Sequence, residues 1–279
     1  MILRSKSKIN LGLKVLNKRT DGLHNIVTIF QEVDFGDKIQ LVKHKTGCQI
    51  KSDVDWIPID NSNICHKAYS ALCHELNQDF GVKISLEKRI PVGSGIGGGS
   101  ANAAATLIGL NSLYNLGLND KKLESIAVNI GADVPFFIRG GTQIGQETGG
   151  KLTPITKKFE AAILLVIPRV SISTEWAYSQ LKNKLKSDNS ILRFANLMRK
   201  DFLSFKFFEN DFETIIFPAY PEIGQIKSKL LNCGAIFSSL SGTGSTVYGV
   251  FDDEAKAISA ESLFKVHYKT CIAHPVKIV

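Results

Sequence analysis

The chain has 279 residues, of which 44% are hydrophobic and 22% are charged, a composition typical of a globular protein with one large domain or two ordinary ones. No apolar signal-like segment opens the chain, and the apolar run 161–167 is too short to cross a bilayer, so we expect a cytoplasmic protein without a membrane partner. The formal net charge of +8 is compatible with an anionic partner. The lysines are spread along the chain, however, and no arginine-rich, aromatic segment favours nucleic acid.

The five cysteines form no Cys-x-x-Cys pair and their number is odd, so we expect free thiols and no zinc site.

The first half of the chain begins with strands. Residues 8–15 alternate between apolar and polar side chains, which predicts a strand that buries Ile9 and its counterparts and places Lys8 and Asn10 together on the other, open face. After an Asp-Gly turn at Asp21, further strands are expected at residues 26–35, 37–43, 48–52 and 82–87. A helix over residues 63–76 is expected to begin at a cap formed by Asn61 or Ser62.

A glycine-rich stretch follows the last of these strands. Five of the seven residues from Gly93 to Gly99 are glycine, and a helix is predicted from Ser100 to Gly117. Glycines let backbone N–H groups approach a ligand, and a helix N-terminus adds unpaired N–H donors and partial positive charge. This combination favours a polyphosphate site over a tightly packed turn.

Two familiar phosphate-binding loops do not fit. Gly93, Gly95 and Gly98 satisfy G-x-G-x-x-G, but a second helix (119–131) follows where the dinucleotide fold needs a strand that ends in an acidic residue. A Walker A loop ends in Gly-Lys-Ser or Gly-Lys-Thr, whereas this loop ends in Gly99-Ser100.

The pattern weakens near residue 158, which predicts domains over 1–158 and 159–279. The second is expected to contain a strand over 161–168, three helices, two strands about residues 241–251, a helix and a last strand, so the predicted class is α+β. The three helices are expected at residues 174–185, 209–217 and 221–232.

The stretch "PVGSGIGGGSANAA" resembles the glycine-rich motif of the GHMP kinases, the galactose, homoserine, mevalonate and phosphomevalonate kinase family. Three other stretches extend the resemblance over nearly the whole chain: "SKINLGLKVLNKRTDGLH", "GADVPFFIRGG" and "SGTGSTVYGVF". They are similar to the branch that phosphorylates a cytidine-diphosphate-linked methylerythritol in isoprenoid biosynthesis. The resemblance implies an N-terminal ribosomal-protein-like α+β domain, a C-terminal ferredoxin-like domain and an active site in the cleft between them.

The resemblance also implies the catalytic residues. Asp133 would accept the proton of the substrate hydroxyl, and Lys8 would keep that carboxylate ionised and attract the transferring phosphoryl group. Without the motifs, Lys8 would be a solvated lysine and Asp133 a turn cap. ATP is the implied co-substrate, with Mg²⁺ arriving on it and no protein ligand named for the metal. The serine that binds metal in other branches of the family is replaced by Gly99.

Further residues are assigned by the same resemblance. ATP is expected to contact the glycine-rich stretch, with two less secure positions at the adenine: Pro91, Gly93, Gly95, Gly97, Gly98, Gly99, Ser100 and Asn102, then Asn63 and Lys88. Lys88 is less secure because it is expected to be an exposed lysine at the end of a strand, which needs no function. The cytidine substrate is expected to contact Asn10, Leu23, His24, Thr174, Tyr178 and Thr243. Asn210 and Asp211 are interpreted only as a helix start, and the turn at Thr243 could alternatively be a plain hairpin connection.

The cytosine is expected to be held by His24 at its edge and by Tyr178 on one face. The family usually has tyrosine before the histidine, to stack on the other face, but this chain has Leu23. The hypothesis is weaker nucleotide binding, because base stacking on an aromatic side chain contributes about 1–3 kcal/mol.

Two other functions stay open at this stage. Another GHMP small-molecule kinase would share the ATP loop but would have no use for His24 as a cytidine contact. A non-catalytic nucleic-acid-binding protein would fit the basic charge, but it would have no evident use for Lys8, Asp133 and the glycines together. A monomer or a weak homodimer is expected.

Overall fold

The computed structural model describes residues 1–156, 160–181, 205 and 208–277. It divides into two compact units that interleave along the chain. Unit 1 comprises Met1–Ser7, Gly36–Pro91 and Gly97–Arg139, and unit 2 comprises Lys8–Phe35, Val92–Ile96 and Gly140–Val279. The strands at residues 8–35 therefore cluster with the C-terminal part of the chain. The expected domain boundary near residue 158 stays a prediction.

Unit 1 is built on a four-stranded sheet in the order β1-β4-β6-β5. β6 shows why these residues form a strand: Val82, Ile84 and Leu86 alternate with polar residues and are buried. β5 runs parallel to β6, and the other pairs are antiparallel. The strands are β1 (Ile2–Arg4), β4 (Lys38–His44), β5 (Cys48–Ser52) and β6 (Gly81–Glu87).

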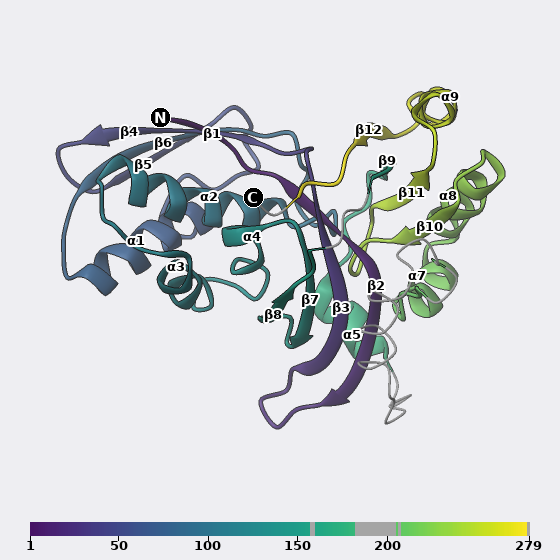
Figure 1. Cartoon of the computed structure of the whole chain (residues 1–279), viewed down its shortest axis with the longest axis horizontal. Helices are drawn as coiled ribbons and strands as arrows, with labels where there is room; N and C mark the ends of the chain where they lie inside the picture. The colour runs from purple at the N-terminus through teal and green to yellow at the C-terminus, as the bar shows by residue number, and fades with distance from the viewer. Residues whose placement is uncertain (157–159, 182–204, 206–207, 278–279) are drawn as a thin grey trace. The chain divides into compact units, whose positions relative to one another are not determined.

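Helices cover one face of this sheet, as Figure 1 shows. The apolar helix α2 lies at their centre, and it packs on β4, α1, α3 and α4. Side-chain caps explain where two of the helices begin: Asn63 accepts a hydrogen bond from Cys65 N, and Asn119 accepts one from Lys122 N. The helices are α1 (Ile64–Leu76), α2 (Gly98–Leu113), α3 (Asp120–Ala127) and α4 (Phe136–Arg139).

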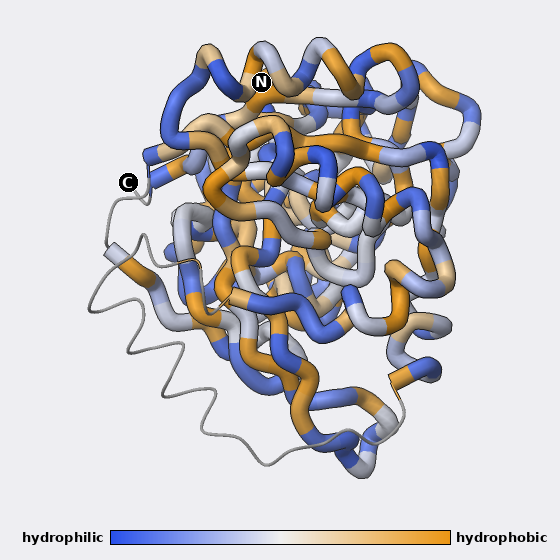
Figure 2. The backbone as a smooth tube through the Cα atoms, turned by 90° about the vertical axis from the view of Figure 1, so that its right-hand side faces the viewer, coloured by the Kyte–Doolittle hydropathy of each residue, from blue (hydrophilic) through white to orange (hydrophobic). Residues whose placement is uncertain are grey.

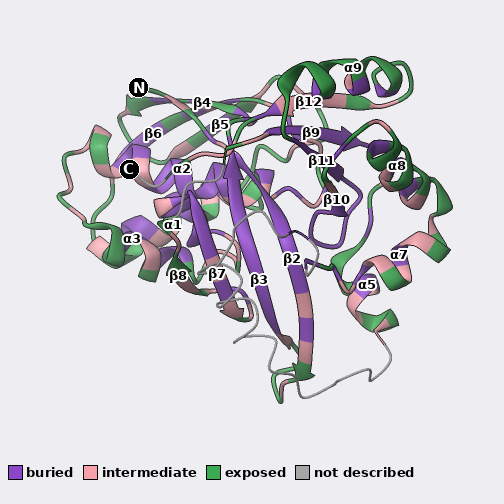
Figure 3. Ribbon diagram, turned by 45° about the vertical axis from the view of Figure 1, so that its right-hand side comes forward, coloured by how far each residue is buried: buried purple, intermediate pink, exposed green. Residues whose placement is uncertain are grey.

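The first sheet of unit 2 has the order β2-β3-β7-β8. Figure 3 shows β2, β3 and β7 buried over most of their length, with exposed residues where the hairpin of β2 and β3 turns at Asp21. The strands are β2 (Ser7–Lys18), β3 (His24–Val33), β7 (Thr142–Glu147) and β8 (Lys151–Pro154), with Ser7 itself in unit 1.

The second sheet of unit 2 has the order β10-β11-β9-β12, and all its pairs are antiparallel. With helices between β9 and β10 and between β11 and β12, it forms the β-α-β-β-α-β arrangement of a ferredoxin-like domain, as the resemblance implies. The elements are β9 (Ala162–Ile167), α5 (Thr174–Gln180), α7 (Glu213–Ala219), α8 (Pro221–Asn232), β10 (Phe237–Leu240), β11 (Val247–Phe251), α9 (Glu254–Phe264) and β12 (Lys269–Ala273).

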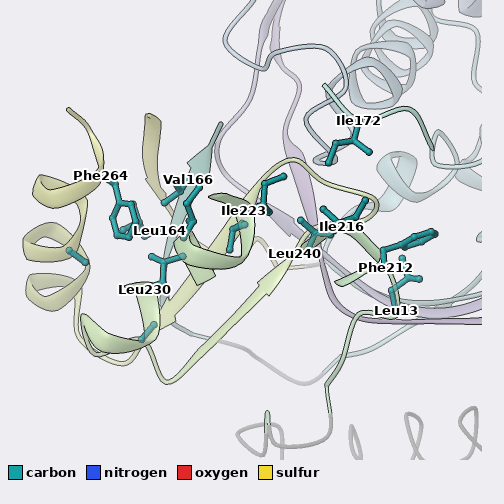
Figure 4. Packing of buried hydrophobic residues seen from close by; sticks show 14 of the residues in the cluster. Leu13, Leu164, Val166, Ile172, Phe212, Ile216, Ile223, Leu230, Leu240 and Phe264 are labelled. Atoms are coloured by element: carbon teal, nitrogen blue, oxygen red, sulfur yellow. The ribbon is translucent and has the colours of Figure 1, made fainter. Parts of the chain in front are cut away.

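One hydrophobic cluster joins these elements of unit 2 (Figure 4). α8 contributes Ile223, Ile226 and Leu230, whose spacing places them on one helix face, and all three are buried. Phe264 of α9 and Leu13 of β2 belong to the same cluster. The cluster therefore fixes β2, which carries Lys8, against the ferredoxin-like sheet.

Most predicted elements are confirmed, including the strand before the glycines and the two helices after them. The predicted cap of α1 is wrong: the cap is Asn63, whose side chain makes the capping bond. The sequence prediction missed β1, α4, β7 and β8, which are short or carry a weak pattern. The segment 182–185 of one predicted helix lies outside the described residues.

Apolar and polar residues alternate closely along the described chain, as Figure 2 shows. Among the residues that the structure describes, no helix is long and apolar enough to cross a membrane. The five cysteines are free thiols, as predicted.

Replacing Phe264 by alanine is expected to destabilise the fold. Its ring is fully buried in the unit 2 cluster. Phe→Ala removes buried apolar surface and leaves a cavity, which together lower the free energy of unfolding by about 3–5 kcal/mol. Denaturant unfolding followed by circular dichroism measures the change. Leu263→Ala is the matched control on the same helix, because Leu263 is 52% exposed and should change the free energy of unfolding by less than about 0.5 kcal/mol. Equal effects of the two variants would contradict the packing described here.

Candidate active site

Lys8 and Asn10 lie on one face of β2, and their side chains touch. Lys8 Nζ donates a hydrogen bond to Asn10 Oδ1 at 2.7 Å, and Asn10 Nδ2 donates to Thr28 Oγ1 at 2.7 Å. The Thr28 hydroxyl donates in turn to Gly12 O at 2.7 Å, so the orientation of the Asn10 amide is fixed.

The predicted common face of Lys8 and Asn10 is confirmed, but its predicted exposure is wrong. Lys8 is 5% exposed and Asn10 is 1% exposed, so this face of β2 is buried. The Lys8 ammonium lies 5.0 Å from the centre of the Phe30 ring. A buried ammonium needs protein dipoles and π-electrons in place of water, and Asn10 and Phe30 supply them.

The first part of the glycine loop, residues 92–96, is fixed within unit 2. Three of its carbonyl groups accept hydrogen bonds. Thr246 N donates to Ser94 O at 3.0 Å, Ser241 Oγ donates to Gly95 O at 2.9 Å, and Lys8 N donates to Ile96 O at 3.0 Å. Gly95 has φ +79°, and a Cβ there would lie 2.3 Å from Ser241 O. Only glycine fits this position, so the loop is held tightly and is no flexible linker.

The second part of the loop belongs to unit 1, where it opens α2. The N-terminal cap of α2 is Gly97, and no side chain makes a capping bond there. A glycine cap leaves the N–H groups of the first turn of α2 without an acceptor from the cap residue, which favours an anion site. Asn102, one turn into the helix, is 3% exposed, and its Oδ1 accepts a hydrogen bond from Ser5 Oγ at 2.7 Å. Gly99 is exposed and Gly98 is buried.

The other predicted ATP positions of unit 1 have contacts of their own. Lys88 pairs with Asp37, and both side chains are buried, whereas sequence analysis treated Lys88 as an exposed residue. Asp37 also accepts hydrogen bonds from Arg89 N at 2.7 Å and Ile90 N at 2.8 Å, which fixes the chain just before Pro91. Asn63 caps α1 and donates to Pro58 O at 2.6 Å.

Asp133 lies in the turn between α3 and α4 of unit 1 and is half-buried. Val134 N donates to Gly131 O at 3.1 Å and closes this turn. The proposed base therefore lies in a short turn between two helices, which limits the movement of its backbone.

His24 and Tyr178 stack on each other in unit 2. Their ring centres are 5.2 Å apart and their planes differ by 22°. Tyr178 also meets Phe212 edge to face, with 4.9 Å between the centres. Burial, and then the positive charge of Lys18, lower the pKa of His24, which is therefore neutral at pH 7 with one N–H donor and one acceptor nitrogen. Leu23, beside it, is 55% exposed.

Thr174 and Thr243 are also brought together. Their hydroxyl oxygens are 3.2 Å apart, within hydrogen-bonding distance. Thr243 belongs to the turn 241–246, which joins β10 to β11 as a hairpin connection. A Cβ on the neighbouring Gly242 would lie 3.5 Å from Asn10 Oδ1 and 3.7 Å from Lys8 Nζ. The turn is thus both a hairpin and a wall of the Lys8 site.

Sequence analysis missed several residues that support this site. Thr28 orients Asn10, the fully buried Tyr248 donates from its hydroxyl to Asn10 O at 2.8 Å, and Ser241 holds Gly95. They lie in strands or a turn far apart in sequence, and no local pattern relates them. Among the described residues, no group of three or more His, Cys, Asp or Glu side chains could hold a metal ion.

The chain was compared with known proteins. A model described as the GHMP kinases N terminal domain matches residues 63–141, and one described as GHMP kinases C terminal matches residues 181–265. A curated protein of Acetivibrio thermocellus is 38% identical over 92% of each chain, and one of Geobacter sulfurreducens is 36% identical over 95% of each. Both are named 4-diphosphocytidyl-2-C-methyl-D-erythritol kinase.

A crystal structure described as 4-(cytidine 5'-diphospho)-2C-methyl-D-erythritol kinase has the same fold, with a TM-score of 0.83 at 26% identity over 99% of each chain. The fold and both family models are those of a GHMP kinase, as the motifs predicted. Within that class, the chain belongs to the family of the 4-diphosphocytidyl-2-C-methyl-D-erythritol kinases.

The variant Lys88→Met tests whether Lys88 stabilises the fold or contacts the adenine of ATP. The variant leaves the buried Asp37 carboxylate without its counter-charge, which we expect to lower the free energy of unfolding by about 3–5 kcal/mol. Chemical denaturation measures this change. Lys38→Met is the matched control, because its pair with Glu87 is exposed and contributes about 0–1 kcal/mol. Unchanged stability with a raised KM for ATP would instead support the adenine contact.

Proposed function

We propose that this chain transfers the γ-phosphoryl group of ATP to the 2-hydroxyl of 4-diphosphocytidyl-2-C-methyl-D-erythritol, in the non-mevalonate route to isoprenoids. The observation that carries the proposal is 35–38% identity, over nearly the whole chain, to relatives that bear this enzyme's name. The substrate is a small molecule, and nucleic acid has no part in the reaction.

In this proposal Asp133 is the base that accepts the hydroxyl proton, and Lys8 is the cation that attracts the transferring phosphoryl group. Phosphoryl transfer depends chiefly on positioning and charge stabilisation, so a carboxylate, an ammonium and a set of N–H donors are sufficient chemistry. The burial of Lys8 supports this role, because the residue is 5% exposed and charge interactions are screened less in a buried setting.

The glycine loop and the N-terminus of α2 bind the ATP phosphates in this proposal. The absence of a side-chain cap on α2 supports it, since N–H groups at that end can donate to phosphate oxygens. Mg²⁺ accompanies ATP as part of the nucleotide and neutralises charge on its phosphates. We name no protein ligand for it, because Gly99 replaces the serine that binds metal in other branches of the family.

His24 and Tyr178 bind the cytosine in this proposal. Two surfaces in contact lie about 3.5–4.0 Å apart, so a base between these rings needs more room than the 5.2 Å that now separates their centres. We infer that the base takes the place of His24 on the Tyr178 face, and that the His24 ring turns to the edge of the base. A neutral imidazole suits that edge, because cytosine offers both donors and acceptors.

The proposal predicts turnover with one alcohol among several. Purified protein with ATP and magnesium should consume ATP with 4-diphosphocytidyl-2-C-methyl-D-erythritol but not with mevalonate, homoserine or galactose. Asp133→Asn should lower kcat by about 100-fold or more, the usual contribution of a general base. A coupled ADP assay measures both.

The other outcomes of this assay separate the rival functions. Turnover with a different alcohol would keep the kinase class and reject the cytidine substrate. Salt-dependent RNA binding without ATP turnover would reject the enzyme altogether. Full activity in Asp133→Asn would remove Asp133 from its role as base.

Leu23→Tyr should tighten binding of the cytidine substrate. Leu23 is 55% exposed beside His24, so a tyrosine ring there can be accommodated and can stack on the base. A stacking gain of about 1–3 kcal/mol would lower KM for this substrate by about 5- to 150-fold. KM for ATP, measured in the same assay, is the internal control and should not change. An unchanged KM for the cytidine substrate would reject the hypothesis that Leu23 weakens its binding.

A further inference from the structure

The segment Glu209–Phe212 lies along β2, and its backbone is fixed there. Leu13 N donates to Glu209 O at 2.8 Å, Asp211 N donates to Leu13 O at 2.9 Å, and Leu13 and Asn210 form a parallel β-bridge. Val15 N donates to Asp211 Oδ2 at 2.8 Å, and Lys14 Nζ donates to Asp211 Oδ1 at 2.9 Å. The two backbone bonds of Leu13, one on each side of Asn210, fix the direction of Asn210, and the Asp211 side chain adds a separate contact with β2.

The Asn210 side chain uses its whole amide group inside unit 2. It is 3% exposed, and Nδ2 donates to Leu240 O and to Gly242 O at 2.8 Å each. Oδ1 accepts from Phe212 N at 3.0 Å. A primary amide supplies two donors and an acceptor in this small volume, which no hydroxyl or carboxylate does. The role as a helix start, expected from the sequence, accounts for only the last of these bonds.

The two carbonyl groups held by Asn210 belong to the end of β10 and to the turn 241–246. This turn lies beside the Lys8 site, since a Cβ on Gly242 would be 3.7 Å from Lys8 Nζ and 3.3 Å from Gly95 O. The same turn carries Ser241, which holds Gly95, and Thr243, which meets Thr174. Its position therefore sets the space around Lys8, Asn10 and the start of the glycine loop.

We propose that Asn210 is a positioning residue of the phosphoryl-transfer site: its amide holds the turn 241–246 in place against Lys8 and Gly95. The inference rests on the proposed function for its kinetic consequence. Asn210 acts through the turn, because its amide donates to Leu240 O and Gly242 O. Loosening the turn should displace the groups around the transferring phosphoryl group, so kcat should fall more than either KM rises.

Two variants of Asn210 and one control variant test the proposal. Asn210→Asp keeps the acceptor for Phe212 N but replaces the two N–H donors by an oxygen that faces two carbonyl groups. Asn210→Ala removes all three bonds. Asp211→Ala is the matched control, because it removes the contacts with Val15 N and Lys14 from the same segment but touches nothing in the turn.

Hydrogen–deuterium exchange of the turn amides, followed by mass spectrometry, is measured with kcat and both KM values at a temperature where every variant is folded. We expect both Asn210 variants to exchange at least tenfold faster in peptides that cover 241–246, and to lose at least tenfold in kcat. Asp211→Ala should keep the wild-type kcat and wild-type exchange in the turn, whatever its melting temperature.

The proposal is overturned if the turn exchanges at the wild-type rate in Asn210→Asp, or if the Asp211 control loses as much kcat as the Asn210 variants at matched stability. Failure of the proposed function gives a different result, namely no turnover by the wild-type protein. The exchange measurement still decides whether Asn210 holds the turn in that case, because it needs no substrate.

Discussion

Lys8 is a buried lysine, 5% exposed, and the hydrogen bonds around it reflect the cost of burying a charged side chain. A buried charge is costly unless protein groups replace its hydration. Asn10 offers its amide oxygen at 2.7 Å, and the ring of Phe30 lies below the ammonium at 5.0 Å. Asn10 can do this only in one amide orientation, which the donor bond to Thr28 selects. A series of hydrogen bonds across β2 and β3 therefore orients the Asn10 amide oxygen toward the Lys8 ammonium.

Backbone hydrogen bonds also fix the glycine loop beside Lys8. The N–H group of Lys8 donates to Ile96 O, so β2 fixes one end of the loop and supplies the cation beside it. Ser241 and Thr246 hold the carbonyl groups of Gly95 and Ser94. Close approach of these backbones is possible because Gly95 has no side chain and has positive φ. Gly95 therefore lets two backbone segments pack closely together, in addition to any role in ligand access.

The sequence predicted the helices and strands better than it predicted the burial and the contacts of the residues within them. Period-two alternation placed Lys8 and Asn10 on one face of β2, but alternation cannot tell whether that face meets water or another part of the chain. The capping residue of α1 was misplaced because Asn61, Ser62 and Asn63 all have side chains that can cap, and backbone geometry alone selects Asn63. Lys88 was interpreted as exposed because its partner Asp37 lies 51 residues earlier in the chain, beyond the reach of any local pattern. Motif resemblance predicts which residues form the site, whereas long-range hydrogen bonds determine the orientation of those that the structure brings together.

The turn 241–246 shows why the plain structural interpretation and the functional one are not alternatives. A hairpin connection between β10 and β11 is required by the ferredoxin-like topology whatever the protein does. Its glycine-rich sequence lets the backbone lie close to Gly95 and Asn10, a proximity that an ordinary hairpin does not need. The turn is held by its own hydroxyl groups, through Ser241 to Gly95 O and Ser245 to Val170 O, and from outside by the Asn210 amide. The partners of these bonds come from other segments of unit 2, so the geometry around Lys8 depends on residues far from it in sequence.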